Sequence, residues 1–209
     1  MHDEQDVPGL PACDDVNQRR RLFVQARARH GLGIESPPVR PVSAKISIDT
    51  PREEVFEILV DLSARPAFTN HFIESFHLLR IEPVGLGAGA RFDLADAGGF
   101  LDSIIEEVDA PHRLVERGHG GRLNRVPNVT EWLLRDTPGP SGCEIEVTFW
   151  TEPSHPLDRL RDRKNSERRL AKGWKRALER LRDLAENGAA PERITVAGGD
   201  RLGHFEPMS

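Results

Sequence analysis

His71, Arg117 and His119 are the side chains whose types could do chemistry in an otherwise apolar setting. Arg117 and His119 are two residues apart in a stretch with strand periodicity, so they share one face with Val115. A guanidinium or imidazole there would either orient a carbonyl or carboxylate group in a pocket or lie in water at the rim of a sheet. His71 has the same kind of alternative, with exposure on a helix surface as the simpler one.

Other reactive patterns are missing from the sequence. It has no tyrosine, and its eight histidines include no HExxH motif. The turn Gly139-Pro140-Ser141-Gly142 lacks the GxSxG spacing of a nucleophile elbow, and Gly85, Gly87 and Gly89 lack the GxGxxG spacing of a phosphate-binding loop. The sequence therefore predicts no catalytic residue, no metal site and no cofactor.

Composition indicates a globular protein with polar extensions. The 209 residues carry a net charge of −5, with 37% hydrophobic and 30% charged residues. No run of 18 apolar residues is present and the N-terminus is acidic, which predicts no membrane span, no signal peptide and a cytoplasmic location. Cys13 and Cys143 are far apart in sequence and are expected to be free thiols.

The elements that must position these side chains are dominated by a long amphipathic segment from Leu157 to Asn187. Pro156 marks its predicted start and Gly188 its end. Gly173 lies inside this helix beside Trp174, where something must come close: either a strand backbone or a ligand. The apolar stripe that needs a partner is Leu170, Trp174, Ala177, Leu178, Leu181 and Leu184.

The polar side of the same helix is strongly basic. Residues 157–183 contain eleven Lys or Arg and five Asp or Glu, so the local charge is +6. Because the whole chain is acidic and no aromatic residues interleave with the basic ones, this side is interpreted as a solvated face, and nucleic acid is not the expected partner.

The rest of the chain divides into an extension, a domain and a tail. Residues 1–40 form an N-terminal extension with one short predicted helix and a Pro- and Gly-rich linker. The domain covers residues 41–187, and residues 188–209 form a C-terminal tail.

Within the domain, a strand at 43–49 leads into Thr50-Pro51-Arg52-Glu53, which predicts a capping box at the start of a short helix ending near Asp61. A second short helix is predicted from Ala64 to about Glu74. Alternating apolar residues and short turns then predict an antiparallel meander. Its strands are 76–81, 90–95, 100–107, 112–119, 129–135 and 144–151.

Four stretches in this order resemble the START-like, or SRPBCC, superfamily, and most closely its bacterial polyketide cyclase/dehydrase and lipid-transport-like group. They are Ile46–Leu62, Val84–Phe92, Val108–Val115, and Gly173-Trp174 with the leucines that follow. The sequence departs from the common pattern at Phe68, where a tryptophan is often found, and residues before Pro41 have no counterpart. The resemblance implies an α+β helix-grip fold, in which a curved antiparallel sheet wraps around the C-terminal helix and encloses an apolar cavity.

If that cavity exists, strand alternation decides which side chains line it. Thr130 and Trp132 are expected to face inward opposite Phe149, whereas a shift of one residue would replace Trp132 by Glu131. All these aromatic residues have a simpler interpretation as core packing. The predicted ligand-binding residues are Phe68, Phe72, Phe92, Leu94, Arg117, Thr130, Trp132, Phe149 and Trp174.

Three functions remain open from the sequence. The favoured one is binding or transport of a hydrophobic small molecule, such as a lipid, a polyketide or an isoprenoid-like compound, because the inward faces carry few polar groups. The second is a polyketide cyclase or dehydratase, which would require an inward ionisable residue. The third is a protein-interaction module that uses the basic face of the helix. The sequence gives no oligomeric state.

Overall fold

A computed structural model describes residues 41–94, 100–121, 123–137, 142–152 and 166–188. The predicted extension 1–40, the tail from 189 and the predicted first part of the long helix at 157–165 lie outside the described residues.

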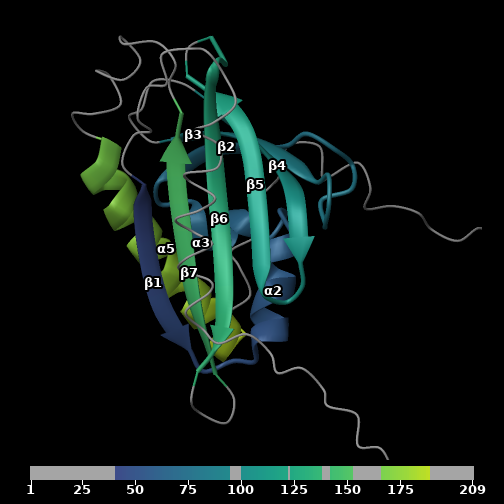
Figure 1. The fold of residues 1–209 in the computed structure, drawn as a ribbon, viewed down its shortest axis with the longest axis vertical. Coiled ribbons are helices and arrows are strands. Elements are labelled where there is room, and N and C mark those ends of the chain that lie inside the picture. Colours follow the sequence, from purple (N-terminus) through teal and green to yellow (C-terminus); the bar gives the residue numbers. More distant parts are fainter. Residues whose placement is uncertain (1–40, 95–99, 122, 138–141, 153–165, 189–209) are drawn as a thin grey trace, which may run out of the picture. The chain divides into compact units, whose positions relative to one another are not determined.

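The described chain forms a seven-stranded antiparallel sheet with helices on one side (Figure 1). The strand order is β1-β7-β6-β5-β4-β3-β2, so the first strand joins the last, and the remaining neighbours follow each other along the chain. The strands are β1 (Val42–Ile48), β2 (Ile73–Leu78), β3 (Gly89–Leu94), β4 (Phe100–Asp109), β5 (Arg113–Gly120), β6 (Val126–Asp136) and β7 (Cys143–Thr151). The predicted meander and the α+β class are confirmed.

Three helices pack on the inner face of the sheet. Short helices α2 (Arg52–Val60) and α3 (Arg65–Thr69) follow β1, and α5 (Ser166–Asn187) closes the domain. The α5 helix contacts β1, α2 and α3, and α2 contacts β6. This arrangement of sheet and helices is the predicted helix-grip fold.

Strand register decides which side chains meet the helices. Trp132 of β6 pairs with Val147 of β7 and with Leu114 of β5, and all three side chains are buried. Directly paired residues point to the same side of a sheet. The apolar stripe of α5 supplies the opposite wall of the core through Trp174, Ala177, Leu178 and Leu181.

Two elements after β1 differ from the sequence prediction. Helix α3 ends at Thr69, and β2 starts at Ile73 and ends at Leu78, earlier than predicted. The alternation of β2 is interrupted by an irregularity between Glu74 and His77, with Ser75 at φ +48°. Because this bulge reverses which residues point to each face of the sheet, the apolar residues of β2 do not alternate regularly, and the start of the strand cannot be predicted from its sequence.

The predicted capping box is also wrong. Helix α2 begins at Arg52 with Pro51 as its N-cap residue, and no side chain caps its backbone. The predicted end of the long helix at Gly188 is confirmed: Gly188 has φ +56°, and its N–H donates to the carbonyl oxygen of Leu184 at 3.1 Å. A glycine tolerates this left-handed conformation at a helix end.

Cys143 is a buried free thiol, as predicted, whereas Cys13 lies outside the described residues. Burial raises the pKa of the Cys143 thiol to about 11. Within the described ranges, no helix combines the length and the apolar character needed to cross a bilayer.

Candidate functional site

An aromatic cluster lies between the inner face of the sheet and α5. The rings of Trp132 and Trp174 meet edge to face with centroids 5.5 Å apart. Phe68 meets Trp132 at 6.4 Å, and Phe72 and Phe149 meet Trp174 at 5.2 and 6.4 Å. Five of the nine residues predicted to bind ligand are therefore brought together from α3, β6, β7, α5 and the turn before β2.

Three further predicted residues lie on the same inner face. Thr130 is buried and pairs with Phe149 across β6 and β7. Phe92 is buried and stacks on Phe76 with centroids 5.9 Å apart, and Leu94 is half-buried against the core. The placement of these side chains follows the alternation of their strands.

Gly173 is approached by an aromatic ring. A Cβ at this position would lie 2.7 Å from Cδ2 of Phe72. The ring of Phe72 therefore takes the place that the sequence left to a strand backbone or to space for a ligand. The missing side chain lets Phe72 pack directly against α5 and so reach Trp174.

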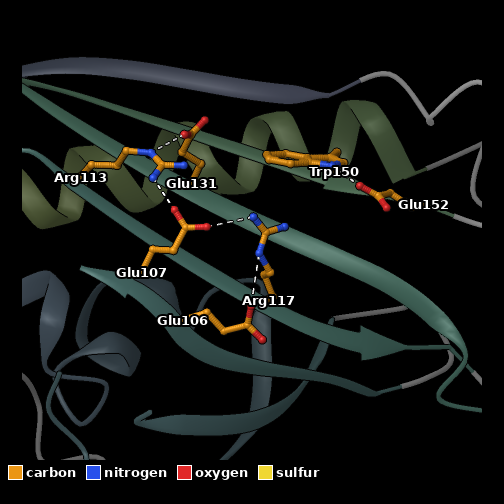
Figure 2. A network of polar contacts seen from close by, with 7 residues as sticks. All are labelled: Glu106, Glu107, Arg113, Arg117, Glu131, Trp150 and Glu152. Atoms are coloured by element: carbon orange, nitrogen blue, oxygen red, sulfur yellow. Dashed lines mark hydrogen bonds and ion pairs between the residues drawn. The ribbon is translucent and has the colours of Figure 1, made fainter. Parts of the chain in front are cut away.

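Arg117 is the predicted site residue that the structure places elsewhere. It pairs with Val129, one residue out of step with the inner-facing Thr130, so its side chain lies on the outer face of the sheet. There it forms ion pairs with Glu106 at 3.3 Å and Glu107 at 3.1 Å (Figure 2). Of the two alternatives for Arg117 and His119, the inward one is wrong, because Leu114 and Glu116 are the residues of β5 that face inward. His119 is exposed, which agrees with the other alternative.

The outer face of β4, β5 and β6 instead carries a network of charges. Arg113 bridges Glu107 and Glu131 at 2.5 and 2.8 Å (Figure 2). The hydrogen bond from Arg113 is the largest of the effects that lower the pKa of Glu107. Partly exposed pairs of this kind contribute little to stability.

The inner face of β5 carries a buried acid that the sequence reasoning missed. Oε1 of Glu116 accepts hydrogen bonds from Arg65 at 2.7 Å and from the indole N–H of Trp132 at 2.8 Å. Its Oε2 accepts a hydrogen bond from the Ser103 hydroxyl at 2.7 Å. Arg65, Glu116 and Ser103 are all buried.

This buried group has a definite chemical character. The positive charge of Arg65 is offset by the negative charge of Glu116, and the guanidinium also lies over the ring of Trp132, 4.9 Å from its centroid. Each oxygen of Glu116 already accepts a hydrogen bond. The arrangement holds the Trp132 ring in one orientation and leaves the inner face without net charge at this point.

His71 connects the helices next to the aromatic cluster. Its Nε2 lies 3.0 Å from the carbonyl oxygen of Gly173, which can only accept, so Nε2 carries the hydrogen. A guanidinium nitrogen of Arg180, which can only donate, lies 3.3 Å from Nδ1. The ring is therefore neutral in this arrangement, and its protonation would cost the Arg180 contact.

We predict that His71 makes the stability of the protein sensitive to mild acid. Burial lowers the pKa of His71 below its ordinary 6.5, and the charges of Arg180 and Arg176 act in the same direction. The imidazole then binds a proton more readily in the unfolded state than in the folded state, so protonation of His71 favours unfolding. The free energy of unfolding is therefore unaffected by His71 well above pH 6.5 and decreases as the pH falls below about 6.5. Urea unfolding at pH 7.5 and 5.5 should show a larger loss for the wild type than for His71→Gln, and equal losses would contradict the prediction.

Comparison of the chain with known protein families gives the same fold. The family model described as polyketide cyclase / dehydrase and lipid transport matches residues 40–186. The chain belongs to this family. The match covers most of the chain and confirms the START-like, SRPBCC resemblance proposed from the sequence.

Solved structures place this family member in the same fold. A protein from Thermus thermophilus, TTHA0849, is 19% identical with a TM-score of 0.56, covering 72% of this chain and 100% of the other. A START superfamily protein from Mycobacterium smegmatis is 14% identical with a TM-score of 0.51, covering 70% and 97%. DynU16, described as a putative protein in the dynemicin biosynthetic locus, is 25% identical with a TM-score of 0.51, covering 75% and 51%. No curated protein matches the chain.

The sequence also predicts a basic, solvated face on α5. In this family member Arg168, Arg169 and Lys172 are exposed, while Ala177, Leu178 and Leu181 are buried. In the described part of the helix the amphipathic division is therefore as expected, whereas the predicted basic residues at 159–164 lie outside the described residues. A role of the basic face in protein interaction stays a prediction.

Proposed function

We propose that the protein binds a hydrophobic small molecule, such as a lipid, a polyketide or an isoprenoid-like compound, between the inner face of the sheet and α5. The observation that carries this proposal is the aromatic cluster of Phe68, Phe72, Trp132, Phe149 and Trp174. Aromatic and aliphatic walls with a few polar groups are typical of small-molecule sites. Membership of a family that includes lipid transport supports the same function.

A second candidate function is a cyclase or dehydratase that acts on a polyketide-like chain in the same place. It is favoured by the buried Arg65 and Glu116, which supply the inward ionisable groups that such an enzyme requires. Binding remains the preferred proposal, because both oxygens of Glu116 are engaged by donors of the protein itself.

The test is native mass spectrometry of the full chain as purified, followed by solvent extraction and identification of any released molecule. We expect a co-purifying apolar compound, and we expect its removal and return to lower and restore the melting temperature. A chain that is free of ligand and whose melting temperature is unchanged by fatty acids, aromatic polyketides and isoprenoids would contradict the proposal. Chemical conversion of an added polyketide would favour the enzyme instead.

A further inference from the structure

Two buried donors on helices α3 and α5, which pack on the inner face of the sheet, lack a partner. Nε1 of Trp174 and Nε of Arg65 are buried without a hydrogen-bond partner among the described residues. A buried polar group without a partner costs the full desolvation penalty of that group, so it calls for an explanation. Both of these atoms are donors, and neither can accept.

The other unpartnered buried atoms lie away from this cluster. Asn124 bonds through its nitrogen to Asp102, whose carboxylate also binds the partly exposed Arg91 on the outer face. Arg52 pairs with the exposed Asp136. Within the described part of the chain, the unpartnered atoms of the aromatic cluster and its buried ion pair are thus donors alone, and a molecule that completes them must bring acceptors.

The two neighbouring indoles of the cluster differ in this respect. The N–H of Trp132 donates to Glu116 at 2.8 Å, whereas the N–H of Trp174 is unpartnered, although the two ring centroids are only 5.5 Å apart. Phe72 and Phe149 surround Trp174 with apolar surface. An acceptor that reaches Trp174 must therefore belong to a molecule with an apolar body.

The charge balance restricts the acceptor further. Arg65 is already neutralised by Glu116 at 2.7 Å, so the inner face offers no uncompensated positive charge to a carboxylate at this point. A ligand carboxylate would lose its hydration and would find no uncompensated positive charge to offset that cost. An uncharged oxygen avoids this cost.

We propose that the ligand is an uncharged apolar molecule with a carbonyl or ether oxygen, and that the indole N–H of Trp174 donates a hydrogen bond to this oxygen. The inference rests on the proposed binding function and adds to it the chemical class of the ligand and the residue that selects it. Trp132 has no such role, because its N–H is committed to Glu116.

The experiment compares three probes of one shape: 2-acetylnaphthalene, its analogue 2-isopropenylnaphthalene, in which a CH₂ group replaces the carbonyl oxygen, and 2-naphthoate. Calorimetric titration of the full chain should show that the ketone binds about threefold to tenfold more tightly than the hydrocarbon, as one hydrogen bond allows. The carboxylate should bind more weakly than the ketone. In an NMR spectrum of the indole N–H groups, the Trp174 signal should move further downfield with the ketone than with the hydrocarbon, which acts on it only through the ring current of the naphthalene.

Trp174→Phe keeps an aromatic ring and removes the donor, so it should bind the ketone and the hydrocarbon equally. Trp150→Phe is the matched control, because Trp150 lies on the outer face beside Glu152 (Figure 2), and its loss should leave the preference for the ketone intact.

The outcomes separate the two proposals. Equal binding of ketone and hydrocarbon by the wild type, with the same shift of the Trp174 signal for both, would overturn the ligand class while binding itself stands. Failure of both probes together with failure of the lipid and polyketide panel would overturn the binding function. If Trp174→Phe does not fold, the wild-type preference and the Trp174 signal decide the question on their own.

Discussion

Glu116→Gln is expected to lower the free energy of unfolding by about 3 to 5 kcal/mol, the usual cost of breaking a buried ion pair from one side. The substitution keeps the size of the side chain and can still accept from the indole of Trp132. It removes the charge that offsets Arg65, whose side chain is only 5% exposed. The guanidinium would then be a buried charge without a counter-ion. Urea unfolding at pH 7.5, followed by circular dichroism, measures the effect.

Glu131→Gln is the matched control for this prediction. Glu131 pairs with Arg113 at 2.8 Å on the outer face of the same sheet, where the arginine side chain is 34% exposed. Arg113 keeps its ion pair with Glu107 and is open to water, so the loss should stay below about 1 kcal/mol. Adding Arg65→Met to Glu116→Gln should restore part of the stability, since no unpaired charge is left. Similar losses for Glu116→Gln and Glu131→Gln would contradict the prediction, because they would show that burial of the ion pair does not increase the cost of breaking it.

The inner-facing residues of β6 and β7 could be predicted from the sequence because their alternation is unambiguous. One parity of β6 turns Trp132 and Leu134 inward, and the other would turn Glu131 inward. The same reasoning fails for β5, where Leu114 and Val115 are adjacent and both buried. Because β5 carries apolar residues on both faces, its sequence does not show which face points inward. The predicted ligand-binding residues therefore include Arg117 and omit Glu116.

The buried pair could not have been predicted from either residue alone. Arg65 begins the short helix α3, Glu116 lies in a distant strand, and each type is mostly exposed in proteins. Only the register that places Glu116 opposite Thr130 on the inner face brings the acid next to Arg65 and Trp132. This contact depends on the tertiary fold. A signal was present, since a strand parity that puts Leu114 opposite Trp132 also turns Glu116 inward.

The glycine of α5 illustrates how a correct local observation can have an unexpected cause. The sequence indicates a close approach at Gly173, because glycine inside a helix costs about 1 kcal/mol relative to alanine. The approaching group is Phe72, from the turn between α3 and β2. That turn has no strong sequence pattern, and its position is set by the packing of α3 against α5.

Gly173→Ala is therefore expected to lower the free energy of unfolding by about 1 to 2 kcal/mol, although alanine normally favours a helix. The new Cβ would lie 2.7 and 2.8 Å from Cδ2 and Cγ of Phe72, near the root of the ring, where a small rotation gives no relief. The ring is held on its other sides by His71 and Trp174, with centroids 4.9 and 5.2 Å away. Overpacking costs about 1 to 3 kcal/mol and outweighs the gain of about 1 kcal/mol in helix propensity.

The comparison of Lys175→Gly with Lys175→Ala, at an exposed position of the same helix, measures the propensity gain without the clash. Placing Gly173→Ala in a Phe72→Leu background should reduce its cost, because a smaller side chain can move aside. Urea unfolding of these variants gives the coupling between the two positions directly. A stabilised Gly173→Ala variant, or a cost unchanged in the Phe72→Leu background, would mean that Phe72 does not pack on α5 as described, and the aromatic cluster around Trp174 would have to be revised.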